Sequence, residues 1–124
     1  MNAKTTKIIF WIATGLLAAM MVLSAGMYFA NYETVATSFT TLGYPTYLIY
    51  PLAVAKILAA IAITTRLNNS LKEWAYAGLF FDFALAATAH LQVGDGEAAP
   101  AFVAIALLFV SYFMGKRLDG SKGA

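Results

Sequence analysis

The chain has 124 residues, of which 61% are hydrophobic and 11% are charged, and its mean hydropathy is +0.73. About a quarter of the residues of a soluble domain are charged, so this composition excludes an ordinary soluble fold and favours membrane-spanning helices. The formal net charge of +2 is too small to suggest a nucleic-acid partner, the lack of cysteine excludes disulfides and thiolate metal sites, and a single histidine excludes a multi-histidine metal or haem site within one chain.

Four apolar segments predict a single all-α domain over residues 1–124, an antiparallel bundle of four transmembrane helices. The predicted spans cover residues 8–30, 45–65, 74–92 and 98–115. At about 1.5 Å per residue each is long enough to cross a hydrocarbon core of about 30 Å, the fourth only just. The first apolar run is longer than the core of a signal peptide, so we expect it to be retained. The short connections place consecutive helices beside one another.

The connection after the first span contains its own helical pattern. Val35, Phe39 and Leu42 recur at positions i, i+4 and i+7, which predicts a short amphipathic helix lying on the outer interface or folded over the bundle as a lid. An ordered loop with one helical turn fits the same residues. Gly43 and Pro45 follow as structural residues, and Pro45 suits the first turn of the second span.

Local punctuation predicts where the third span begins and ends. Residues 70–73 read "SLKE", in which Ser70 and Glu73 match a capping box that opens a helix. Trp74 follows as an interfacial aromatic residue. The string "GDG" at 94–96 is typical of a turn.

The basic residues indicate the orientation of the bundle. The connections at residues 31–44 and 93–97 contain Glu33, Asp95 and Glu97 and no lysine or arginine. By the positive-inside rule, both termini and the second connection are therefore cytoplasmic. The basic residues at these places are Lys4, Lys7, Arg66, Lys72, Lys116, Arg117 and Lys122.

Two opposite charges lie inside the predicted spans. Asp82 lies ~13 Å from the inner end of the third span and Lys56 ~15 Å from the inner end of the second, at 1.5 Å per residue. A single charge near the bilayer centre costs roughly 2.5–3.5 kcal/mol on insertion scales. Because neighbouring helices bring the two groups to nearly the same depth, we expect Lys56 and Asp82 to meet.

The helix faces around this pair predict which sides are buried. A stripe on the second span carries Lys56, and a stripe of small residues on the third span carries Asp82. We expect both stripes to face the bundle, with Phe80 toward lipid, because small residues permit close helix contact. The stripes are Ile49, Ala53, Lys56, Ala60 and Ile63, and Ala75, Gly78, Asp82, Ala86 and Ala89.

Two interpretations of the pair remain open. Lys56 and Asp82 are either an ion pair that fixes helix register or the polar floor of a ligand-binding cavity, with Tyr50 and His90 as wall or mouth residues. His90 also fits an interfacial hydrogen bond to a loop. A metal site of His90 with Asp95 and Glu97 has a sparse ligand set, so we predict no metal.

Several short strings in this order resemble the DoxX-like family. They are "LGYPTYL" at 42–48, Lys56, "LKEWAYAG" at 71–78, "FFD" at 80–82, His90 and "GD" at 94–95. Leu85 and Ala89 stand where similar proteins often have glycine and serine. The resemblance implies a small four-helix protein of bacterial inner membranes. It also favours a quinone-like or lipid-like ligand, because the family takes its name from a membrane subunit associated with quinol oxidation.

Three functions remain as hypotheses. The leading one is a membrane protein that binds a lipophilic molecule at Lys56 and Asp82, serving as a subunit of a membrane redox system, without an intrinsic cofactor or an independent catalytic activity. The second is a structural or assembly protein that docks onto another membrane protein or a second copy. The third is an enzyme that moves protons on a lipophilic substrate, with Asp82 and Lys56 as acid and base. In all three the lipid bilayer is a partner.

Overall fold

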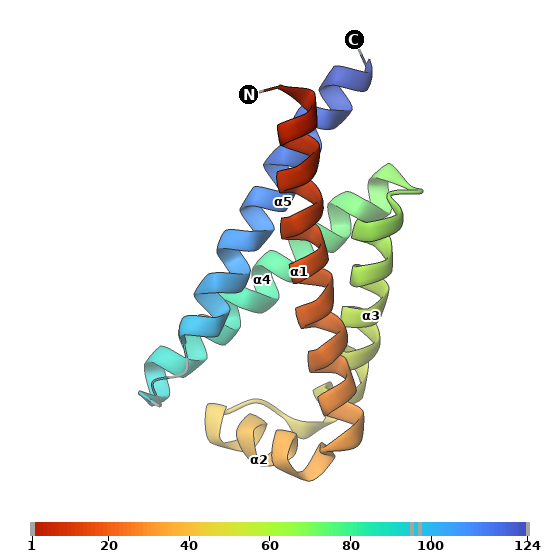
Figure 1. The fold of residues 1–124 in the computed structure, drawn as a ribbon. Coiled ribbons are helices and arrows are strands. Elements are labelled where there is room, and N and C mark those ends of the chain that lie inside the picture. Colours follow the sequence, from red (N-terminus) through yellow and green to blue (C-terminus); the bar gives the residue numbers. More distant parts are fainter. Residues whose placement is uncertain (1, 95, 97, 124) are drawn as a thin grey trace.

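The described part of the chain folds into five α-helices and one short 3₁₀ segment (Figure 1). The computed structural model describes residues 2–94, 96 and 98–123, with side chains up to Asp119. In chain order the elements are α1 (Ala3–Ala30), α2 (Tyr32–Leu42), η1 (Thr46–Leu48), α3 (Ile49–Thr65), α4 (Asn69–Val93) and α5 (Ala99–Gly123).

Among the residues that the structure describes, three helical segments are long and apolar enough to cross a membrane. They are Ala3–Ala30, Thr46–Thr65 and Ala99–Asp119. Helix α4 has 25 residues, but it carries Asp82 near its middle and polar residues at both ends, and it is not among the three. The all-α architecture is therefore confirmed, and three of the four predicted spans meet the apolar requirement.

Helix α1 packs against both α3 and α5, and α4 packs against the same two helices. Both termini lie at one end of the molecule, which we call the terminal end, while α2 lies across the opposite end, the α2 end (Figure 1). The core between the long helices consists of Leu17, Met21, Ala60, Ile63, Tyr76, Leu79, Phe83, Ala104 and Leu108.

The predicted buried face is right for α3 and only partly right for α4, where Ala89 is buried and Ala75 packs against the core. The buried residues of α3 are Ile49, Ala53, Lys56, Ala60 and Ile63. On α4 the core is filled instead by Tyr76, Leu79 and Phe83, whereas Gly78 is exposed and Phe80 is partly buried against the core. Large side chains bury more apolar area than small ones, so they fill the core where the helices do not cross closely.

The start of α4 differs from the predicted capping box. Asn68 is the N-cap, and its side-chain oxygen accepts a hydrogen bond from the backbone nitrogen of Leu71 at 3.0 Å. Ser70 therefore lies inside the first turn, and Glu73 is engaged by α5: Lys116 lies 2.6 Å away and the Tyr112 hydroxyl donates to it at 2.9 Å. Asn68, two residues before Ser70, already accepts a hydrogen bond from a free backbone N–H of the first turn, so Ser70 is not needed as the N-cap.

The connections match the sequence more closely. The amphipathic helix is confirmed as α2, with Val35 and Phe39 buried, and it ends at Gly43 in the left-handed conformation (φ 86°). Pro45 stands just before η1 rather than in the first turn of α3. Trp74 is 71% exposed. The turn after α4 has left-handed Gly94 and Gly96, while Asp95 and Glu97 lie outside the described residues.

Helix α5 continues well beyond the predicted end at residue 115. Its final turns keep helical structure to Gly123. The apolar run ends near Gly115, but Asp119 finds partners on the α3–α4 connection, where it pairs with Arg66 and Lys72. The helix thus extends beyond the apolar run, and this extension carries the paired carboxylate of Asp119.

Three buried hydroxyl groups join α1, α4 and α5. The Ser111 hydroxyl lies 2.5 Å from the Thr14 hydroxyl and 2.6 Å from the Tyr76 hydroxyl. Thr14 and Ser111 are fully buried and Tyr76 is 6% exposed. Each hydroxyl is satisfied by its neighbours, so the network fixes the register of three helices without an unpaired polar group.

Replacing the central hydroxyl is expected to destabilise the fold. Ser111→Ala removes the common partner of Thr14 and Tyr76, and we expect a loss of about 1–2 kcal/mol in the free energy of unfolding. Chemical unfolding in detergent measures the effect, with Ser70→Ala on exposed α4 surface as the matched control. Equal stability of the two variants would show that the network contributes nothing.

Candidate functional site

A cavity of about 360 Å³ lies at the α2 end, bordered by all five α-helices and by the segment between α2 and α3. This volume is within the range of about 300–1,000 Å³ that is typical of small-ligand sites. The walls are mostly apolar, and the polar or charged lining residues are Ser24, Tyr28, Tyr44, Lys56, Asp82 and His90.

The ammonium group of Lys56 is the most constrained charge in this cavity. Lys56 is only 9% exposed. Its Nζ donates a hydrogen bond to the Ser24 hydroxyl at 2.9 Å and lies 4.8 Å from the centre of the Tyr28 ring. A buried cation is costly unless it is partnered, and these two contacts from α1 supply part of that compensation.

Asp82 supplies the opposite charge from α4. Its Oδ2 lies 3.8 Å from Lys56 Nζ, so the two groups meet as the sequence predicts. This separation permits an ion pair but is too long for a hydrogen bond. Within the part of the chain that the structure describes, no hydrogen bond reaches the Asp82 carboxylate. The carboxylate, 28% exposed at its side chain, is therefore able to accept a hydrogen bond from a bound molecule.

The other two predicted site residues lie in different places. His90 is half-buried and lines the cavity two turns beyond Asp82 on α4. Tyr50 lies outside it: half of the side chain is exposed, and its ring stacks on Phe29 and Tyr32 at 5.5 and 5.1 Å. Tyr50 follows buried Ile49 directly, and one residue is about 100° around a helix, which turns the ring away from the cavity.

Three polar lining residues were missed from the sequence. Ser24 is the one polar side chain between Thr14 and Tyr28 in α1, and this isolation is a signal that could have identified it. Tyr28 and Tyr44 have the appearance of interfacial aromatic residues in the sequence. Only the packing of α2 against α1 and α4 brings them to the cavity.

Helix α2 and the residues after it cover one side of the cavity. Phe39 makes edge contacts with the rings of Tyr28 and Tyr44, at 5.6 and 6.1 Å between ring centres. The Tyr44 hydroxyl donates to the backbone oxygen of Leu85 on α4 at 3.0 Å. This hydrogen bond joins the segment after α2 to α4 beside the cavity, and we call it the Tyr44 latch.

A second, larger hollow of about 760 Å³ runs between α3 and α4 toward the terminal end. Its lining is almost entirely apolar, and it shares Leu52, Lys56 and Asp82 with the cavity. The ion pair therefore lies where the cavity and the groove along α3 and α4 adjoin. No cluster of three or more potential metal-ligating side chains occurs among the described residues.

Comparison with known proteins identifies the family. Residues 12–113 match the family model described as the DoxX-like family, which confirms the resemblance found in the sequence. No curated protein and no solved structure matches the chain.

The Tyr44 latch makes a prediction about the mobility of α2. Tyr44→Phe removes one hydrogen bond while keeping the ring, so we expect amide exchange in residues 35–42 to quicken by about fivefold, equivalent to ~1 kcal/mol. Hydrogen-exchange mass spectrometry measures this, with Tyr47→Phe, at a 76% exposed position, as the control. Unchanged exchange in Tyr44→Phe would show that the hydroxyl does not hold α2.

Proposed function

The chain belongs to the DoxX-like family, and from this premise we propose that it is a four-span membrane protein that binds a lipophilic molecule in the cavity beneath α2. The bound molecule is quinone-like or lipid-like, with a polar head at Lys56 and Asp82. One observation carries the proposal. In the described structure Lys56 and Asp82 meet at the edge of an apolar cavity, and their charged atoms lie 3.8 Å apart, beyond hydrogen-bond distance.

The chemistry of the pair suits a head with oxygen atoms. Lys56 is a donor to a carbonyl or phosphate oxygen, and Asp82 is an acceptor for a hydroxyl group. A separation of 3.8 Å leaves a ligand atom free to contact both groups at once. A few convergent polar groups in an otherwise apolar wall are the usual design of a small-ligand site.

The groove between α3 and α4 supports a route from the bilayer to this site. It reaches Lys56 and Asp82 through side chains such as Leu52 and Ala59, so a lipophilic molecule would approach without crossing water. The tail of a bound molecule would then lie between α3 and α4, with its head against the pair.

In this proposal the chain is a binding subunit of a membrane redox system rather than an independent catalyst. The sequence has no cysteine and one histidine, so electrons exchanged with a quinone-like ligand would come from a cofactor held by a partner protein. The second candidate is a scaffold role. The contacts of Lys56 with Ser24 and Asp82 join α1, α3 and α4, which is the arrangement of a structural ion pair.

Ligand retention separates these two functions. Native mass spectrometry of gently extracted protein is expected to show a lipophilic molecule on the wild type and at least about tenfold less on Asp82→Asn, because a charge-assisted hydrogen bond contributes about 1.5–3 kcal/mol. Glu33→Gln makes the same carboxylate-to-amide change on the exposed surface of α2 and should retain the ligand.

The comparison requires variants of equal thermal stability. If Asp82→Asn and wild type carry the same lipids in the same amounts, the binding proposal is wrong. If Asp82→Asn instead loses stability and a stoichiometric protein partner, the scaffold role is favoured.

We also propose that the protein resides in the bacterial inner membrane with the terminal end in the cytoplasm. Six of the basic residues whose side chains are described belong to the terminal end, where Glu73 and Asp119 are the acids. These six are Lys4, Lys7, Arg66, Lys72, Lys116 and Arg117. The positive-inside rule assigns such an end to the cytoplasm.

The absence of native cysteine makes this orientation directly measurable. A membrane-impermeant maleimide is expected to label Glu33→Cys in intact cells, and to label Lys4→Cys only after the membrane has been permeabilised. Both positions are exposed. The reverse labelling pattern would place α2 in the cytoplasm and contradict the proposal.

A further inference from the structure

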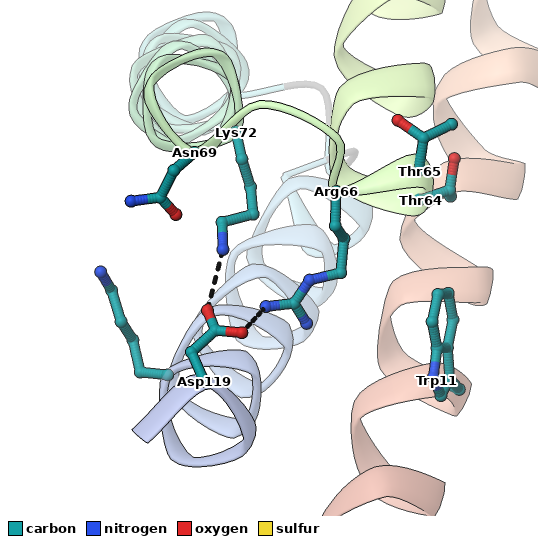
Figure 2. A pocket seen from close by; sticks show the side chains of 8 residues that line it. Trp11, Thr64, Thr65, Arg66, Asn69, Lys72 and Asp119 are labelled. Carbon is teal, nitrogen blue, oxygen red and sulfur yellow. Dashed lines mark hydrogen bonds and ion pairs between the residues drawn. The ribbon is translucent and has the colours of Figure 1, made fainter. Parts of the chain in front are cut away.

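A charged pocket of about 510 Å³ lies at the terminal end, at the opposite ends of α3 and α4 from α2 (Figure 2). It forms where α3 ends, α4 begins and the final turns of α5 pass by. Its basic lining residues are Arg66, Lys72 and Lys116, and Asn69 and Trp11 line it as well.

One carboxylate holds two of these cations in place. Asp119 accepts from Arg66 at 2.6 Å through one oxygen and from Lys72 at 2.9 Å through the other, as Figure 2 shows. Lys72 is buried, at 7% exposed, and its ammonium has three donors. One carboxylate therefore leaves positive charge and donor capacity on both cations.

The position of Arg66 is fixed by the surrounding structure. The residue adopts the left-handed backbone conformation (φ 54°) that is uncommon outside glycine, and its guanidinium lies 4.5 Å from the centre of the Phe10 ring. Gly115 makes room for this packing, because a Cβ there would lie 3.0 Å from Phe10 and 3.3 Å from Arg66 Nη1. The guanidinium is thus held in a set orientation before any ligand arrives.

The cluster has an excess of positive charge. Lys116 pairs with Glu73 at 2.6 Å, so three cations face two carboxylates. The hydrogen bond from Lys116, with that from Tyr112, lowers the pKa of Glu73 despite its partial burial, so this carboxylate is ionised at neutral pH. One net positive charge remains, and exposed Lys4, Lys7 and Arg117 add to it at the same end.

We propose that this pocket binds the phosphate group of an anionic lipid. Phosphate oxygens match the remaining donors of Arg66 and Lys72 and the side-chain amide of Asn69. Basic pockets between transmembrane helices at the cytoplasmic side are suited to anionic headgroups. Trp11, 43% exposed beside the pocket, is the kind of side chain that lies at the headgroup level.

The neighbouring groove favours a lipid over a free anion. Thr65 lines both the charged pocket and the apolar groove between α3 and α4. Leu67, Leu71 and Trp74 line the groove close to that shared residue. A phosphate in the pocket therefore has an apolar surface beside it on which an acyl chain can lie.

A lipid titration tests the site on the full chain in a neutral detergent. Native mass spectrometry is expected to show phosphatidylglycerol binding more tightly than phosphatidylcholine, whose headgroup has no net charge. Lys116→Gln should weaken phosphatidylglycerol binding by about fivefold, the effect of one basic residue near an anionic headgroup. Arg117→Gln removes the same charge one residue along α5 but does not line the pocket, and should weaken binding much less.

Each other outcome has a definite meaning. Equal binding of the two lipids, or equal weakening by Lys116→Gln and Arg117→Gln, would overturn the proposal and leave a general attraction to the basic end. Inorganic phosphate that stabilises the protein as well as phosphatidylglycerol does would replace the lipid with a free anion.

Discussion

The ammonium group of Lys56 is the constraint around which the helices are arranged. A positive charge in the middle of an apolar helix has to be compensated, and each compensating group comes from another helix: the Ser24 hydroxyl and the Tyr28 ring from α1, and the Asp82 carboxylate from α4. Helix α3 cannot rotate or slide without separating these groups. The polar centre therefore fixes the relation of three helices, with Asp82 at ion-pair distance from Lys56 but beyond hydrogen-bond distance.

The two ends of the molecule are held together by different kinds of interaction. At the α2 end, aromatic rings and one tyrosine hydroxyl cover an apolar cavity, so the closing contacts are mainly packing contacts. At the terminal end, the helices are joined by ion pairs. Asp119 of α5 pairs with Arg66 and Lys72, and Glu73 of α4 pairs with Lys116 of α5. Between the ends, the Thr14, Tyr76 and Ser111 hydroxyls join α1, α4 and α5 without a charge.

Much of the fold and the central pair could be predicted from the sequence, because apolar run length and helical periodicity report burial directly. The stripe through Lys56 was predicted from helical spacing, and a short helix around Val35, Phe39 and Leu42 was one of the two alternatives that their spacing allowed. The buried side of α4 was only partly predicted, since small residues and large rings are both compatible with a helix interface. Tyr50 and Tyr44 show the remaining limit. Both are aromatic residues near one end of the molecule, and only the tertiary path of α2 decides that Tyr44 lines the cavity while Tyr50 stacks outside it.

The last turns of α5 act as a counterion for a connection that precedes them by about fifty residues, since Asp119 pairs with Arg66 across a sequence separation of 53. Arg66 and Lys72 are translated long before this carboxylate is made. Until α5 has been made, the charges of Arg66 and Lys72 lack the Asp119 carboxylate that pairs with both of them. A chain truncated before Asp119 would keep its apolar helical segments almost complete but would lose the carboxylate that pairs with Arg66 and Lys72. Changes at the C-terminus, such as tags and truncations, therefore also affect the α3–α4 connection.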